Sequence, residues 1–174
     1  TLANTISQWG TRRWKWTPYL WIEHGDIIPF LSIWDKWNKI QDSTTAVVIK
    51  DDFMEKCRTW DELSKKVMSK YIKSTVEKWY PYCFFWNNVN DNRPDVYKDK
   101  GLYIEHSQLC SEILLNTDSE HSFVCCLSSI NLLHRDEIKD TDAVETMIFF
   151  LDSVITEFLT SLEVFRDSDD KDKV

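Results

Sequence analysis

The sequence predicts an α/β fold in which at least some strands pair in parallel. Short β-branched or aromatic runs alternate along the chain with longer segments whose apolar residues recur at helical spacing. Such alternation is typical of α/β proteins. The 174 residues, 43% of them hydrophobic, suffice for one domain with a core. We therefore expect a single α/β domain over residues 1–165 and a charged, disordered tail over residues 166–174.

Three segments have the composition of strands. Residues 17–24 (TPYLWIEH) predict a short strand that leads into a turn at His24 and Gly25. Residues 44–50 (TTAVVIK) form a β-branched run, and residues 82–86 (YCFFW) suit a buried strand. The polar segment 87–101, rich in turn-forming residues, is expected to be a loop.

The first three predicted helices begin at polar residues. Asp26 is expected to cap a helix through residues 27–37, and residues 51–52 open a short helix that carries Cys57. Thr59 and Glu62 match a capping box at the start of a helix that reaches about Trp79. Pro81 stops that helix because proline lacks the N–H needed to continue it.

The last predicted helix covers residues 143–165, with Asp140 or Thr141 as its cap. Apolar residues surround it nearly completely, so we expect it to be covered on several sides. A turn at 116–121 and a second apolar run at 122–133 precede it. The polar residues Asp152 and Glu157 interrupt its sequence, and no run of the chain approaches the roughly 18 apolar residues of a membrane helix.

The net charge and the number of cysteines argue against several kinds of protein. The formal net charge of -8 disfavours binding to nucleic acid or to an anionic membrane. The five cysteines form an odd set without a CxxC pair, and residues 1–10 show no signal-peptide core, so we expect reduced thiols in a soluble, cytoplasmic protein. The histidine spacing matches no metal-ligand pattern, and we predict no metal site.

The segment SQLCSEI (107–113) contains an unusual arrangement of polar residues. If it is extended, Gln108, Cys110 and Glu112 point to the same side, which places a thiol between an amide and a carboxylate. Taken alone, a single cysteine is more often a small buried hydrophobic residue. The common nucleotide-binding and hydrolase signatures are absent from the sequence.

Two cysteine-containing motifs, taken together, identify a protein family more specifically than Cys110 and its neighbours alone. SQLCSEILLNT followed by EHSFVCCLSSINL resembles the large, catalytic subunit of class I ribonucleotide reductases, and the resemblance extends upstream through YPYCFFWNNVNDNRPDVYKDKGLYIEHS and TTAVVIKDDFMEK. The family fold is a ten-stranded α/β barrel around a finger loop. The resemblance implies that this chain supplies a central part of that barrel.

The resemblance also implies roles for individual residues. Cys110 matches the cysteine that becomes a thiyl radical and abstracts the ribose 3′ hydrogen, and Glu112 matches the carboxylate that accepts the 3′ hydroxyl proton. Cys125 matches one half of the redox dithiol, while Cys126 falls at a non-catalytic position that faces away. Gln108 stands where the family usually has a substrate-orienting asparagine.

The same resemblance implies companions for this chain. The second redox cysteine lies upstream of the matched region in the family, and the phosphate loop, the radical relay and the C-terminal cysteine tail lie downstream. We expect the remaining parts of the large subunit, a metal-containing small subunit that supplies the radical, and thioredoxin or glutaredoxin as partners. This chain itself is expected to bind no cofactor; dNTP or ATP effectors belong to the full enzyme, whose specificity loop corresponds to residues 34–43, with Lys39 and Gln41 as candidates.

The nine tryptophans leave two interpretations open. By the resemblance, Trp9, Trp14, Trp37 and Trp79 stand where the family tends to have glycine, and such glycines serve positive φ or close backbone approach. In one interpretation, the chain is part of a split ribonucleotide reductase that other chains complete. In the other, it is a non-enzymatic interaction protein derived from that enzyme, which binds a partner through an aromatic-rich surface.

Overall fold

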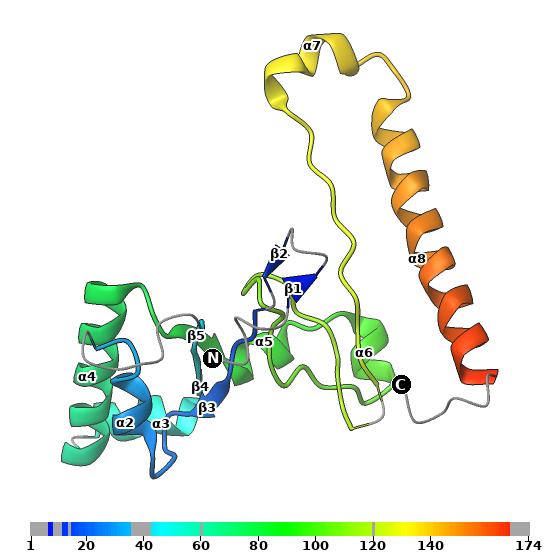
Figure 1. Cartoon of the computed structure of the whole chain (residues 1–174). Helices are drawn as coiled ribbons and strands as arrows, with labels where there is room; N and C mark the ends of the chain where they lie inside the picture. The colour runs from blue at the N-terminus through cyan, green and yellow to red at the C-terminus, as the bar shows by residue number, and fades with distance from the viewer. Residues whose placement is uncertain are drawn as a thin grey trace. The chain divides into compact units, whose positions relative to one another are not determined.

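The computed structural model describes residues 7–8, 12–13, 15–35, 43–59, 61–119 and 121–167 (Figure 1). The chain divides into two compact units, Thr1–Phe123 and Val124–Val174, and each is described by itself. The expected single domain over residues 1–165 stays a prediction. Of the expected tail at 166–174, residues 166 and 167 belong to the last helix, and residues 168–174 lie outside the described residues.

A three-stranded parallel sheet organises the first unit. Its strand order is β3 (Tyr19–Trp21), β4 (Ala46–Ile49) and β5 (Tyr82–Phe85). The register pairs Leu20 with Val47, and Val47 with Cys83. The three strands and their parallel pairing confirm the sequence prediction. A separate antiparallel pair joins β1 (Ser7–Gln8) to β2 (Arg12–Arg13).

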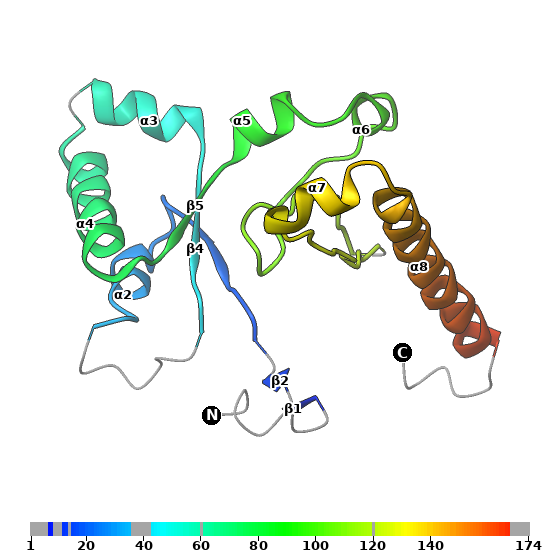
Figure 2. The same cartoon turned by 90° about the horizontal axis from the view of Figure 1, so that it is seen from above.

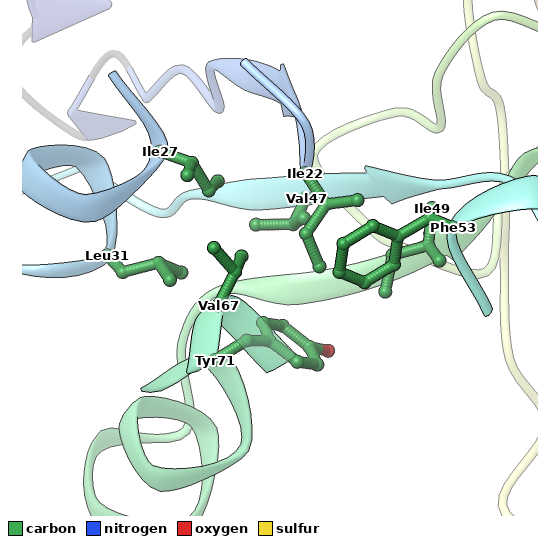
Figure 3. Packing of buried hydrophobic residues seen from close by; sticks show 8 residues of the cluster. All are labelled: Ile22, Ile27, Leu31, Val47, Ile49, Phe53, Val67 and Tyr71. Atoms are coloured by element: carbon green, nitrogen blue, oxygen red, sulfur yellow. The ribbon is translucent and has the colours of Figure 1, made fainter. Parts of the chain in front are cut away.

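Three helices cover one face of this sheet (Figure 2): α2 (Ile27–Leu31), α3 (Asp51–Arg58) and α4 (Glu62–Lys78). Side chains of β4 alternate between the two faces of the sheet, as strand geometry requires. Val47 and Ile49 point toward these helices and pack with residues of the turn after β3 and of all three helices. Figure 3 shows that cluster: Ile22, Ile27, Leu31, Val47, Ile49, Phe53, Val67 and Tyr71.

The other face of β4 has a smaller core. Val48 packs there with Phe84 and Ile104, and Trp86 and Val89 lie against this cluster. The expected loop at 87–101 is therefore partly wrong, because it contains α5 (Trp86–Asp91) and α6 (Asp95–Asp99). Burial of one face of α5 against the sheet stabilises a helix whose sequence consists mainly of turn-forming residues.

Two predicted helix caps are corrected. Asp61 caps α4, because its carboxylate accepts a 2.8 Å hydrogen bond from the N–H of Ser64. The predicted cap, Thr59, instead ends α3, and its hydroxyl donates to the carbonyl of Glu55. Asp26 makes no capping bond to α2, which is shorter than predicted. Thr59 and Asp61 are close enough in sequence for either to cap α4, and the path of the chain between α3 and α4 decides between them.

Trp79 occupies a backbone conformation that favours glycine. It directly follows α4 with φ of 66°, in the left-handed region, and its indole is 82% exposed. A positive φ is what the resemblance to a glycine position predicts, so this expectation is confirmed for Trp79. Trp9, Trp14 and Trp37 lie outside the described residues.

Replacing Trp79 with glycine is expected to raise the free energy of unfolding by about 1 kcal/mol, because glycine adopts positive φ without a steric cost. The exposed indole has little packing to lose. Urea denaturation measures the change. Trp79→Ala is the matched control, since alanine removes the indole but keeps the Cβ atom. Equal stabilisation by alanine and glycine would show that the indole, and not the backbone conformation, sets the cost.

The second unit is mainly helical. It contains a 3₁₀ turn η1 (Leu132–His134), α7 (Arg135–Ile138) and α8 (Ala143–Asp167). The last helix is confirmed, and the hydroxyl of Thr141 accepts a hydrogen bond from the N–H of Ala143, which favours Thr141 of the two predicted caps. Much of the apolar surface of α8 is exposed in this chain, and its covering on several sides stays a prediction. None of the described helices has the length and hydropathy required to span a membrane.

Candidate functional site

Cys110 lies in a turn. The N–H of Ile113 donates to the carbonyl of Cys110 (3.0 Å), and the N–H of Gln108 donates to the carbonyl of Ile113 (2.9 Å). Cys110 therefore lies at a bend of the chain. The extended conformation considered for this segment does not form, because the chain reverses between residues 109 and 112. Gln108, Cys110 and Glu112 therefore lie in or beside one tight turn and not along one side of a strand.

Side chains hold the two arms of this loop together. Asn116 donates its side-chain N–H to the carbonyl of Tyr103 (2.6 Å). The ring of His106 links Thr117, through Nε2 (3.0 Å), to the carbonyl of Ser107, through Nδ1 (3.1 Å). Because a carbonyl only accepts, Nδ1 donates to Ser107, and in the tautomer with its proton on Nδ1 the ring accepts a hydrogen bond from the Thr117 hydroxyl at Nε2.

Asn90 anchors the first arm to α5. Its side chain is 1% exposed and bonds to both backbone groups of Ile104: Nδ2 donates to the carbonyl (3.0 Å), and Oδ1 accepts from the N–H (2.9 Å). The same Nδ2 also donates to the carbonyl of Trp86 (3.0 Å). The amide thus replaces a neighbouring strand as the partner of Ile104, which is buried at the start of the arm that leads to Cys110.

A hydroxyl chain connects the loop to the first strand. The Ser107 hydroxyl donates to the carbonyl of Gln108 (2.8 Å), so its oxygen accepts the hydrogen bond from Tyr19 at the start of β3. The ring of Tyr19 also lies 5.6 Å from that of His106. These contacts tie the backbone of Gln108 to the sheet, which limits the freedom of the turn that carries Cys110.

Two further tyrosines lie near the Cys110 turn. Tyr80 and Tyr82 have ring centroids 5.2 Å apart, and Tyr80 also stacks on Trp34 at 4.8 Å. The hydrogen bond with Tyr80 and partial burial, with smaller contributions from the nearby charges of Tyr80, Cys110 and Tyr19, together raise the pKa of Tyr82 to about 12. The sequence argument missed this group of hydroxyls. Its only signal was that Tyr19 and Tyr82 each stand near the start of a predicted strand.

Exposure limits what this loop can do by itself. Cys110 and Glu112 are exposed, and Gln108 is half-buried. A thiol, a carboxylate and an amide on one turn can together donate a hydrogen atom, accept a proton and orient a hydroxyl. Radical chemistry also requires protection from water and reductants, which the exposed thiol lacks in this chain.

The other predicted site residues lie elsewhere. Cys125 and Cys126 belong to the second unit, both are half-buried, and all five cysteines are free thiols. The apolar run around Cys125 does not form a strand: residues 122–130 have no regular structure, and their backbone makes no hydrogen bond to any described residue. Lys39 and Gln41 lie outside the described residues. Within the described ranges, no three His, Cys, Asp or Glu side chains form a group able to hold a metal ion.

Comparison with known proteins gives consistent matches. The family model for the ribonucleotide reductase barrel domain matches residues 61–173. A Frog virus 3 (isolate Goorha) protein, provisionally named a ribonucleoside-diphosphate reductase large subunit, is 32% identical over 167 residues. That match covers 85% of this chain and 30% of the viral protein. The ribonucleoside-diphosphate reductase large subunit of Invertebrate iridescent virus 3 is 28% identical, over 74% of this chain and 19% of the relative.

A solved structure agrees. The class Id ribonucleotide reductase alpha subunit of Actinobacillus ureae superposes with a TM-score of 0.75 and 42% identity, over 84% of this chain and 28% of the other. The chain thus spans less than a third of the length of each of these relatives. The matched region includes both cysteine motifs on which the sequence resemblance rested. This chain therefore belongs to the ribonucleotide reductase large-subunit family and corresponds to part of its barrel domain.

Proposed function

We propose that this chain contributes the radical-bearing loop to a ribonucleotide reductase that reduces ribonucleoside diphosphates to deoxyribonucleotides. The observation that carries the proposal is the tight turn that contains Cys110, flanked by Gln108 and Glu112, inside the region matched by the family. In the complete enzyme, this loop is the finger inside a ten-stranded barrel.

The proposed chemistry assigns one task to each residue. A thiyl radical on Cys110 takes the 3′ hydrogen of the substrate, and Glu112 accepts the proton of the 3′ hydroxyl. The 2′ hydroxyl leaves as water. Cys125 and a second thiol supply two electrons and two protons and end as a disulfide. Glu112 then returns its proton to the 3′ oxygen, and Cys110 returns the hydrogen to the 3′ carbon, which restores the thiyl radical. Gln108 orients the substrate hydroxyls by hydrogen bonding.

The proposal requires partners. Cys110 is exposed in this chain, so further protein must cover it before a radical can persist there. We assign that cover to the remaining parts of the large subunit. A metal-containing small subunit generates the radical, and thioredoxin or glutaredoxin reduces the disulfide. Lys39 and Gln41 are the candidates for coupling a bound dNTP or ATP effector to substrate choice.

Reconstitution tests this proposal. The isolated chain, with dithiothreitol as reductant, should produce no deoxyribonucleotide from any ribonucleoside diphosphate. Product should appear when the chain is mixed with the Frog virus 3 relative lacking its matching segment, together with that virus's small subunit. Turnover by the chain alone would contradict the proposal. So would an assembled complex, verified by sedimentation, that makes no product.

The interaction-protein alternative rests on a different observation, the exposure of large apolar side chains such as Trp79 and Phe149. Surfaces of this kind favour binding to another protein. The genomic neighbourhood separates the two proposals. Adjacent reading frames for the missing parts of the subunit favour the enzyme, and an isolated gene favours the interaction protein.

A further inference from the structure

Tyr19 and Tyr82 stand in one row across the parallel sheet. Tyr19 pairs with Ala46 in β4, and Ala46 pairs with Tyr82 in β5. Paired residues of neighbouring strands point to the same face of a sheet, and residues two apart on one strand share a face. Ala46 therefore shares the face of Val48, opposite to the face that α2, α3 and α4 cover. The row thus lies on the face that packs against Ile104, at the start of the arm that leads to Cys110.

The phenol of Tyr19 joins this row to the loop that carries Cys110. Its hydroxyl bonds to the hydroxyl of Ser107, a residue that is only 4% exposed. Since the Ser107 hydroxyl gives its one proton to the carbonyl of Gln108 (2.8 Å), only its lone pairs remain for Tyr19. Tyr19 therefore has to donate, and phenylalanine at this position could not replace it.

The two peptide groups that enter the turn both have hydrogen-bond partners. The group between Ser107 and Gln108 accepts at its carbonyl from Nδ1 of His106 (3.1 Å) and donates its N–H to the carbonyl of Ile113 (2.9 Å). The next carbonyl, that of Gln108, accepts from the Ser107 hydroxyl. These bonds fix the direction of the backbone two residues before Cys110.

The position of Cys110 depends on these bonds because its own surroundings are open. Cys110, Ser111 and Glu112 are exposed, so packing around their side chains does not hold the turn in this chain. Catalytic groups have to be held within about 0.5 Å of the productive geometry, and a displacement of about 1 Å can slow a reaction about a hundredfold. A change of backbone direction at Gln108 would move the thiol by such an amount.

We propose that Tyr19 and Ser107 are positioning residues for Cys110. The phenol of Tyr19 fixes the Ser107 hydroxyl, and that hydroxyl fixes the carbonyl of Gln108, so the orientation of the turn follows that of strand β3. Both residues act through the backbone of the turn and not through contact with the substrate. The effect on catalysis rests on the proposed function of Cys110, but the link from Tyr19 to the turn does not depend on it.

Hydrogen exchange of the full chain by itself tests this link. In Tyr19→Phe, the ring keeps its contact with His106, and only the hydroxyl is lost. Exchange of the Gln108 amide should become about fivefold faster, the change expected for the loss of one hydrogen bond. Ser107→Ala removes both hydroxyl bonds and should accelerate this exchange by about tenfold or more. The amide of Val47, in the central strand, should exchange as in the wild type.

Tyr103→Phe and Ser111→Ala are the matched controls. They remove an exposed phenol on the arm before the turn and an exposed hydroxyl inside the turn, and they should change the exchange of the Gln108 amide by less than about twofold. Circular dichroism confirms that every variant is folded. Unchanged exchange of Gln108 in Tyr19→Phe would overturn the proposal. Equal acceleration of Gln108 and Val47 would also overturn it, because it would show a general loss of stability.

The reconstituted enzyme provides the test of positioning. Tyr19→Phe should lower kcat about tenfold and change KM for the ribonucleoside diphosphate by less than about twofold, since the variant displaces the thiol but removes no substrate contact. Tyr103→Phe should keep the wild-type kcat. An unchanged kcat in Tyr19→Phe would overturn the positioning role. A wild-type complex without product would instead contradict the proposed function, and the exchange rates alone would then decide whether Tyr19 holds the turn.

Discussion

Replacing Cys110 with serine will abolish deoxyribonucleotide formation by the reconstituted enzyme. A serine O–H bond is much stronger than a thiol S–H bond, so the side chain can no longer carry the radical, and each 1.4 kcal/mol added to the barrier slows the reaction tenfold. The turn itself should persist, because its two hydrogen bonds join backbone atoms only. Product formation, measured by chromatography of the nucleosides, should fall to background.

Cys126→Ser provides the matched control. Cys125 and Cys126 are adjacent and equally half-buried, but only Cys125 matches the redox position, so Cys125→Ser should remove multiple turnover while Cys126→Ser should retain it. Activity in Cys110→Ser above a few per cent of wild type would refute the radical role. Loss of activity in Cys126→Ser alone would show that the two residues have been assigned the wrong way round.

Asn90→Leu is expected to lower the free energy of unfolding by about 4 kcal/mol. Leucine has a similar size but cannot form the three hydrogen bonds of the Asn90 side chain, and it leaves the buried N–H and carbonyl of Ile104 without partners. Each unpaired buried group costs about 1–3 kcal/mol. Chemical denaturation measures the loss, and hydrogen exchange should show faster exchange of the Ile104 amide.

Asn92→Leu is the control for this effect. Asn92 lies just after the same helix and donates to the carbonyl of Asn88, but it is exposed, so its replacement should change stability by about 0.5 kcal/mol or less. A similar loss in both variants would mean that leucine disturbs α5 itself. No loss in Asn90→Leu would show that the arm before Cys110 is anchored by other contacts.

Local patterns in the sequence predicted the parallel sheet and the longest helices. β4 is buried on both faces, and a continuous β-branched run is the direct consequence of that burial. Helices α4 and α8 are long enough for their apolar spacing to be recognised. These features depend on residues within one segment, and for that reason the sequence alone determines them.

Short elements and caps could not be predicted in the same way. Helix α5 forms because Trp86 and Val89 pack against residues of distant strands, and the cap of α4 is Asp61 because the chain turns there. The segment around Cys125 has strand composition but no strand, since a strand requires partners that its own sequence does not specify. For α5 and for the segment around Cys125, the deciding contacts join residues far apart in the chain.

The same distinction between local sequence and tertiary contacts applies to the candidate site. The sequence by itself identified Gln108, Cys110 and Glu112, because their order within a family motif is a local property. Only the tertiary structure showed that these three residues lie in or beside one turn and that Asn90 anchors Ile104, on the arm that leads to this turn. It also showed that Tyr19 bonds to Ser107 and that Tyr82 lies near Cys110. Hydrogen bonds between segments from 14 to 88 residues apart hold this arrangement, and no periodicity within one segment encodes such pairings.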